Sequence, residues 1–182
     1  MLSDPVGGIN VRGMNANTPG IILGRVASLH LHPPEPGRPL TSAEAIEVIA
    51  DKGIAGEPRY FGRVNGDPGL PTRRQVSLIE REQIAEHATA LGREALLPGA
   101  VRSNIETFGI SLIPLVGREV EIGEAVLLLF QPRTPCAKMD AICLGLRALM
   151  ANGRQGVMAQ VVRSGRIRVN DPIKLAKPGP HA

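Results

Sequence analysis

Cys136 is the residue whose local sequence most clearly favours chemistry. It follows the segment 132–135 (PRTP) and precedes a helix that we expect to begin near Asp140. Pro135 restricts the backbone before the thiol, and neighbouring cations and a helix N-terminus both favour a thiolate. A soft metal ion or an electrophile requires a thiolate, so Cys136 is a candidate metal ligand or nucleophile. The alternative is an ordinary buried cysteine, which most lone cysteines are.

Two loops add polar candidates. Loop 53–62 (GIAGEPRYFG) places Glu57 and Arg59 after Gly56, and glycines allow a backbone to approach a ligand closely. Loop 97–105 places Arg102 and Asn104 after a Pro-Gly turn. Arginine can neutralise an anion and asparagine can both donate and accept hydrogen bonds, although Asn104 could instead bond its own turn. The loop 53–62 does not match a nucleotide-binding fingerprint.

The other cysteine and the histidines favour structural roles. Cys143 is expected inside a helix as a small core residue, seven positions after Cys136 and outside any zinc spacing. His30 and His32 alternate along a strand and could supply two of the four ligands of a zinc site, but no companion Cys or His is evident. We therefore expect both histidines to be exposed at a strand edge. His87 is expected to face solvent. No local pattern supports a cysteine–histidine catalytic pair.

The elements that must position these residues are mostly short strands. Apolar periodicity predicts helices over 80–91 and 140–151. Segment 42–50 begins with a capping box that predicts a helix, although its apolar residues fit a strand as well. We therefore expect a mostly β fold with flanking helices (α+β), a largely antiparallel barrel or sheet. Strands are predicted over 21–32, 74–79, 112–116, 120–130, 157–163 and 166–169 (these two as a hairpin), and 173–175.

Composition limits the remaining classes of protein. The chain has 182 residues, 43% hydrophobic and 21% charged, which suits one globular domain without structural disulfides. Its longest apolar run, 125–130, is too short for a membrane helix, and its start has no signal-peptide pattern. The net charge is +4, yet no basic run points to nucleic acid. We predict a cytoplasmic protein with an arm (1–20), a domain (21–175) and a frayed tail (176–182).

The order of these motifs resembles the MOSC domain, named for the C-terminal part of molybdenum cofactor sulfurase. The resemblance covers about residues 22–175, and it depends on order and spacing because each piece is weak alone. The matching pieces are 53–57 (GIAGE), 74–79 (RQVSLI), 98–105 (PGAVRSNI), 109, 112, 115–117 (LVG), 121–123 (EIG), 135–136 (PC), 145–146 (GL), 156–157 (GV), 165–167 (GRI) and 171–173 (DPI).

The resemblance implies a β-barrel that binds a molybdenum–pterin cofactor (molybdopterin). Cys136 would then be the catalytic residue and the metal ligand, as in relatives that reduce N-hydroxylated compounds. It could instead carry a persulfide, since sulfurases of the family receive sulfur from a separate pyridoxal phosphate domain. The partners implied are the anionic pterin, a cysteine desulfurase or an electron-transfer protein, with no nucleic acid or membrane. The cofactor-binding candidates are Gly56, Glu57, Arg59, Arg74, Arg102 and Asn104.

Three departures from the family pattern keep a third hypothesis open, a binding module without catalysis. The usual loop Gly-Asp-Arg-His reads GEPR at 56–59, and Ser103 stands where glutamate is usual. The chain also leaves no room for an aminotransferase-like or reductase domain, so we expect a stand-alone MOSC protein that depends on outside partners. Whether it is an enzyme is left open by the sequence.

Overall fold

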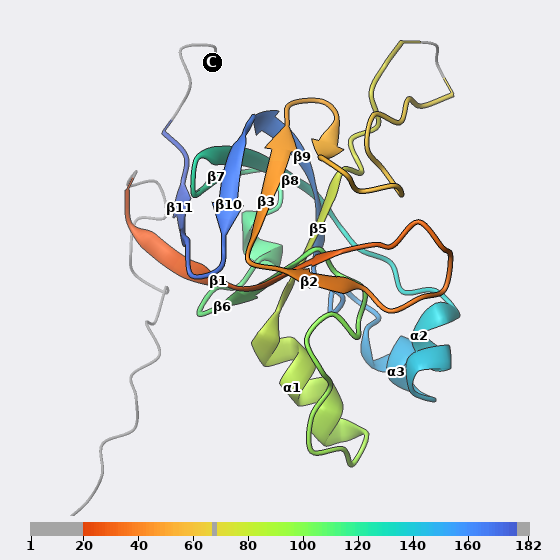
Figure 1. Ribbon diagram of the computed structural model, residues 1–182. Helices are drawn as coiled ribbons and strands as arrows, with labels where there is room; N and C mark the ends of the chain where they lie inside the picture. The colour runs from red at the N-terminus through yellow and green to blue at the C-terminus, as the bar shows by residue number, and fades with distance from the viewer. Residues whose placement is uncertain (1–19, 67–68, 178–182) are drawn as a thin grey trace, which may run out of the picture.

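The computed structural model describes residues 20–66 and 69–177, which form short strands and three helices (Figure 1). The helices are α1 (Arg81–Ala90), α2 (Lys138–Ile142) and α3 (Leu146–Leu149), with a 3-10 turn, η1, at Ile113–Leu115. The strands are β1 (Ile22–Leu31), β2 (Thr41–Ala43), β3 (Ala45–Ile49), β4 (Gly53–Ile54), β5 (Val76–Glu80), β6 (Ile105–Phe108), β7 (Glu119–Ile122), β8 (Ala125–Pro132), β9 (Val157–Arg163), β10 (Gly165–Arg168) and β11 (Pro172–Leu175).

Seven strands close into a barrel in the order β11-β7-β8-β9-β5-β6-β1, because β1 also pairs with β11. Every neighbouring pair is antiparallel except β5 and β6, which are parallel and are connected through α1. The long strand β1 pairs with β11 near its start, then with β6, and finally with β2. Strands β10, β3 and β4 form a separate small sheet. This architecture confirms the predicted mostly β, largely antiparallel barrel with flanking helices.

Two apolar clusters hold the fold together. The larger fills the barrel with Leu, Ile and Val side chains from its strands. The smaller lies between the barrel and the three helices, where Ile79 of β5 meets Ile84 of α1, Met139 of α2 and Leu146 of α3. Burial of such side chains contributes roughly 1.5–3 kcal/mol each. The second cluster therefore anchors α2, and with it the loop that carries Cys136, to the barrel wall.

Three predicted elements were wrong. Segment 42–50 is not a helix but β2 and β3, so the strand alternative was right; Ile46 and Val48 alternate into the core while Glu47 is exposed. Segment 112–116 is not a strand, because Pro114 lies in the 3-10 turn Ile113–Leu115, where Leu115 N–H donates to the Leu112 carbonyl. The predicted helix 140–151 divides into α2 and α3 at Gly145, whose φ of 90° is left-handed.

The predicted hairpin of 157–163 and 166–169 was also wrong. β9 pairs with β8 and β5 in the barrel, whereas β10 pairs with β3 in the small sheet. The chain crosses from one sheet to the other at Gly165, where a Cβ would lie 2.5 Å from the backbone carbon of Glu124. This close approach explains the glycine, and it makes Ser164-Gly165 a crossover rather than a hairpin turn.

The predicted arm, except Gly20, and residues 178–182 of the predicted tail lie outside the described residues. The domain limits at 21 and 175 stay a prediction. Within residues 20–66 and 69–177, no helix is both long and apolar enough to cross a membrane.

Candidate functional site

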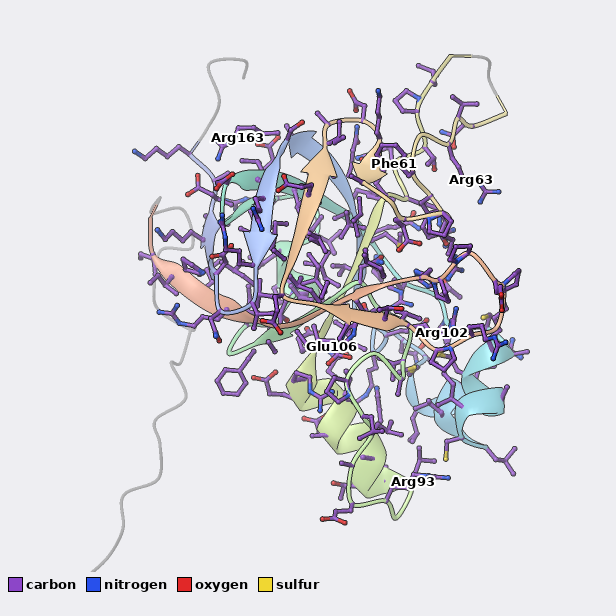
Figure 2. All side chains as sticks on the ribbon, in the orientation of Figure 1. Phe61, Arg63, Arg93, Arg102, Glu106 and Arg163 are labelled. Carbon is purple, nitrogen blue, oxygen red and sulfur yellow. The ribbon has the colours of Figure 1, made fainter. Side chains whose placement is uncertain are left out.

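A cavity of about 180 Å³ lies between the barrel and α2, and Cys136 is in its wall. Arg102, which is labelled in Figure 2, lines this cavity together with Lys138 and Met139 of α2. The lining comes from six segments that are far apart in the sequence, so no single sequence motif could have predicted this cavity. The lining residues are His32, Arg59, Tyr60, Arg74, Ser77, Arg102, Arg133, Thr134, Cys136, Lys138, Met139, Gln155 and Met158.

The loop after β8 fixes the position of Cys136. Arg133 N–H donates to the Gly156 carbonyl at 2.9 Å, which joins the start of the loop to β9. Met139 N–H donates to the Cys136 carbonyl at 3.0 Å, which begins the turn into α2. Met139 is in turn buried in the second apolar cluster. The thiol is exposed and unpaired, so a bound group or a partner protein can reach it, and the ordinary buried-cysteine alternative is wrong.

Five cationic side chains line the same cavity as this thiol: Arg59, Arg74, Arg102, Arg133 and Lys138. Among the described residues the Arg133 guanidinium donates only to neutral acceptors, to Ser103 Oγ at 3.2 Å and to the Gln155 and Arg102 carbonyls at 3.3 Å. Burial, and then the charge of Arg59, lower the pKa of Arg133 to about 10, so it remains protonated at neutral pH.

Arg102 is a second partly buried cation whose hydrogen bond goes to a neutral acceptor. Its Nη1 donates to the Arg38 carbonyl at 2.8 Å, while its Nε is buried without a hydrogen-bond partner in the described part of the chain. Burial, and then the charge of Arg59, lower its pKa, and the charge of Glu57 opposes them. Its backbone has a left-handed φ of 59°, which is strained for a residue with a side chain. The five cationic side chains of the cavity together attract an anion.

A buried polar network behind the cavity wall holds these groups in place. Glu57 is fully buried, and its Oε2 accepts from His32 N–H at 3.0 Å, His32 Nδ1 at 3.2 Å and Asn104 Nδ2 at 3.0 Å. Burial alone would raise the pKa of Glu57, but the hydrogen bonds from His32 outweigh it and lower that pKa. With its proton on Nδ1, His32 leaves Nε2 to accept from Arg59 Nη1 at 3.0 Å. The carboxylate thus orients His32, which orients Arg59.

Asn104 completes this network from the other side. Its Oδ1 accepts from Ser77 N–H at 3.2 Å and Ser77 Oγ at 2.8 Å, and its Nδ2 also donates to the His30 carbonyl at 3.2 Å. All four hydrogen-bonding positions of the amide are therefore used. Asn104 connects β5, β6 and the end of β1 rather than capping its own turn, so the local-turn alternative for this residue was wrong.

The predicted site residues fall into two groups. Arg59, Arg74, Arg102 and Cys136 line the cavity together. Glu57 and Asn104 lie buried behind it, where they support its wall. Gly56 is exposed with a left-handed φ of 78°, so it supplies the turn before Glu57. The structure thus brings together residues from both candidate loops and the cysteine segment.

The histidine predictions were wrong. His30 and His32 are 1% and 5% exposed, because the chain after β1 turns inward over Asn104 and Glu57 rather than forming a free edge. His87 is 1% exposed, and its Nε2 lies 2.8 Å from the Arg154 carbonyl, a partner that sequence periodicity does not reveal. Cys143 packs partly buried against the second cluster as predicted, but it follows α2 in an extended conformation rather than lying inside a helix, and its sulfur accepts from Arg93 Nε at 3.1 Å.

Sequence reasoning missed several lining residues. His32, Ser77, Gln155 and Met158 were not predicted as site residues. Ser77 lies within the family motif piece 74–79, and Gln155 directly precedes the piece 156–157. These positions are the one sequence signal that could have identified the two residues as part of the site. Arg133 and Lys138 were noted beside Cys136 in sequence, and the structure places both in the wall.

A second, larger groove of about 810 Å³ adjoins the loop that carries Cys136 and shares Arg133 and Thr134 with the cavity. Its other lining residues come mainly from α2, α3 and the loop that follows, and they do not include Cys136. The smaller cavity is therefore the candidate site, because it joins the thiol to the cations. In the described ranges no group of three or more His, Cys, Asp or Glu side chains is arranged to hold a metal ion.

Comparisons with solved structures agree with the fold. The YuaD protein from Bacillus subtilis superposes with a TM-score of 0.69 at 19% identity, covering 83% of this chain and 94% of that one. YiiM from Escherichia coli gives a TM-score of 0.60 at 19% identity, covering 85% and 71%. YiiM from Geobacillus stearothermophilus gives 0.59 at 19% identity, covering 88% and 77%. No curated protein sequence matches this chain significantly.

Because these sequence identities are low, the structural matches show only that the fold is shared. The sequence model of the MOSC domain matches residues 51–174, which is more than half of the chain. That span contains every predicted cofactor-binding residue as well as Cys136. The chain therefore belongs to the MOSC domain family.

Proposed function

We propose that this protein binds a molybdenum–pterin cofactor in the arginine-lined cavity, with Cys136 as the protein ligand to the metal. The observation that carries the proposal is the meeting of one exposed thiol with five cationic side chains in a single small cavity. A molybdopterin carries a phosphate and a dithiolene, both anionic. A soft sulfur donor among cations is the environment that such a ligand requires.

The chemistry of the lining fits this group. Within the described residues no carboxylate pairs with Arg102 or Arg133. Arg102 Nη1 donates to the Arg38 carbonyl and Arg133 donates to neutral oxygens, so both guanidinium groups have capacity for an anion. The volume of about 180 Å³ suits the metal and its immediate anionic neighbours. Typical sites for a whole organic ligand are larger, about 300–1,000 Å³, so the rest of the cofactor would extend from the open side of this cavity.

The chain's own residues would have distinct roles. Cys136 would hold the metal, and Arg74, Arg102 and Arg133 would bind anionic oxygens. The Glu57–His32 pair would keep Arg59 aimed at the cavity. When bound, the cofactor would supply two-electron redox chemistry, such as reduction of an N-hydroxylated compound to the amine and water with electrons from a separate electron-transfer protein.

Elemental analysis and pterin fluorescence on protein purified from a cofactor-producing host test the proposal. We expect molybdenum and pterin in near-stoichiometric amounts with the wild type. Cys136→Ser should lose most of the metal, because a hydroxyl is a poor soft-metal ligand. Cys143→Ser is the matched control and should retain it. Equal molybdenum contents in both variants would refute the ligand assignment.

A second candidate function is sulfur transfer, and the exposure of Cys136 favours it. An exposed thiol beside cations can attack the persulfide of a cysteine desulfurase and take its outer sulfur, while the desulfurase cysteine leaves as a thiolate. The new persulfide can then be presented to an acceptor. Incubation with a desulfurase and cysteine, followed by mass spectrometry, should then show one added sulfur on Cys136. An adduct confined to Cys143 would rule out this candidate.

A further inference from the structure

We infer that the larger groove beside the Cys136 loop is a second binding site, and that its ligand is a small organic anion with an apolar body. The charged end of this ligand pairs with Arg147 of α3, and its body lies on the apolar wall of the groove. The inference goes beyond the proposed function, because the groove is distinct from the arginine-lined cavity and its lining does not include Cys136. A medium-chain carboxylate is the simplest molecule of this class.

The wall of the groove is mostly apolar and suits an organic molecule in size. Its volume of about 810 Å³ lies within the range of about 300–1,000 Å³ that is typical of small-molecule sites. A single exposed leucine is ordinary, but Leu144, which is 86% exposed, shares this groove with four other apolar side chains, none of them buried. Apolar surface gathered in one groove marks a binding site. The five apolar side chains are those of Pro132, Pro135, Leu144, Ala148 and Ala151.

The charges of the groove favour an anion. Its charged residues are Arg133, Arg147 and Asp140. The Asp140 carboxylate is already engaged, because its Oδ1 accepts from Gly145 N–H and from Arg147 N–H, each at 3.1 Å. The Arg147 side chain is exposed and has no hydrogen-bond or ion-pair partner among residues 20–66 and 69–177. An unpaired guanidinium beside an apolar wall matches a ligand with a hydrophobic body and one negative end.

The groove is held in shape before a ligand binds. The two hydrogen bonds to Asp140 close the turn between α2 and α3, the short helices that lie beside each other in Figure 1, and Gly145 in this turn has a left-handed φ of 90°. Pro132 and Pro135 restrict the backbone of the loop that forms another part of the wall. A preformed site spends less binding free energy on ordering itself, so even a small ligand can bind.

The groove adjoins the proposed cofactor site. Arg133 and Thr134 line both the groove and the cavity, and Pro135, which directly precedes Cys136, lines the groove. A ligand in the groove therefore contacts the segment that positions the thiol. The geometry places this organic anion next to the proposed site rather than inside it.

Calorimetric titration of the full chain with three probes tests the inference. Decanoate joins a long apolar chain to one negative charge, hexanoate has the same charge on a shorter chain, and decyltrimethylammonium has a long chain with a positive charge. Decanoate should bind about tenfold more tightly than hexanoate or better, because each fully buried methylene strengthens binding about fourfold. Decyltrimethylammonium should bind at least about fivefold more weakly than decanoate, because it cannot pair with Arg147.

Variants at exposed positions locate the bound probe without disturbing the core. Arg147→Gln should weaken decanoate binding about fivefold, the effect of losing one exposed ion pair. Ala148→Glu puts a carboxylate in the groove and should weaken it about fivefold or more. Arg63→Gln is the matched control, because Arg63 is exposed, is labelled in Figure 2 and lines neither the groove nor the cavity. Arg74→Gln removes a cation from the cavity alone, and neither it nor the control should change decanoate binding.

Several results would overturn the inference. A wild type that does not bind decanoate would do so, and this is the result expected if the groove serves a protein partner instead. Equal binding of decanoate and decyltrimethylammonium, or equal effects of Arg147→Gln and Arg63→Gln, would also do so. A loss of decanoate binding in Arg74→Gln but not in Arg147→Gln would assign the anion to the cavity. None of these results depends on molybdenum content, so they are distinct from a failure of the proposed function.

Discussion

Replacing Asn104 by Asp tests the buried network with almost no change of shape. Asn104 Nδ2 lies 3.0 Å from Glu57 Oε2, and Glu57 is fully buried with a lowered pKa, so it is ionised. Asn104→Asp puts a carboxylate oxygen where this donor was. Two charges about 3 Å apart repel by about 5–6 kcal/mol at an effective dielectric constant of about 20.

Protonation limits this cost. Holding a carboxyl group of ordinary pKa, about 3.9, protonated at about pH 7 costs roughly 4 kcal/mol, at 1.36 kcal/mol per pH unit. This is less than the repulsion, so the folded variant keeps one proton between the two carboxyl groups. The unfolded chain releases that proton. The pair's pKa is thus raised by folding, and the variant's stability is greatest at low pH and falls as pH rises.

We therefore predict both a loss of unfolding free energy and a dependence of that loss on pH. Relative to the wild type, Asn104→Asp should lose roughly 4 kcal/mol of unfolding free energy near pH 7 and roughly 1–2 kcal/mol near pH 5. Urea unfolding between about pH 5 and 8 measures both values. Asn152→Asp, at an exposed position, is the matched control and should show little change. A loss for Asn104→Asp that does not vary with pH would refute the assigned contact with Glu57.

Two further variants test other parts of the fold. Burial raises the pKa of Glu80, against the opposing hydrogen bond from Leu112 N–H, so its contribution to stability is present at low pH and is lost as pH rises through the folded pKa. Glu80→Gln keeps an acceptor for Leu112 and should raise the unfolding free energy near pH 7 by about 1 kcal/mol in urea titrations; lower stability there would contradict this account. Gly156→Ala should cost about 3 kcal/mol or more in the same assay, because its Cβ would overlap the Leu78 carbonyl oxygen. Gly117→Ala, which also has a positive φ but open space around it, should cost only about 1 kcal/mol, and equal losses would show that crowding at Gly156 is unimportant.

The fold class was predictable because apolar periodicity and turn residues act locally. The helix α1 and the strands β1, β5 and β11 lie within a few residues of their predicted limits. Which strands pair with one another was not predictable from these local signals. The crossover at Gly165 depends on the backbone of Glu124, which is distant in sequence, and no local pattern distinguishes it from a hairpin turn.

The candidate site shows the same division. Cys136 and Arg102 were predictable from residue type and from a family resemblance. The burial of His32 was not, because it depends on a carboxylate 25 positions later in the chain. Gln155 gave no signal beyond its place next to the motif piece 156–157, since its burial in the cavity wall is visible only once its surroundings are known. Long-range polar contacts thus decide which residues near a motif become part of the site.

Residue-resolved alkylation of cofactor-loaded protein tests the central claim most directly, since Cys143 serves as an internal reference in the same molecule. Protein from a cofactor-producing host and protein from a cofactor-deficient host are treated briefly with iodoacetamide near neutral pH and analysed by mass spectrometry. If Cys136 is the metal ligand, its alkylation falls in the loaded sample in proportion to molybdenum content, while that of Cys143 is the same in both. Equal alkylation of Cys136 in the two samples, with molybdenum present in one of them, would contradict the proposed site.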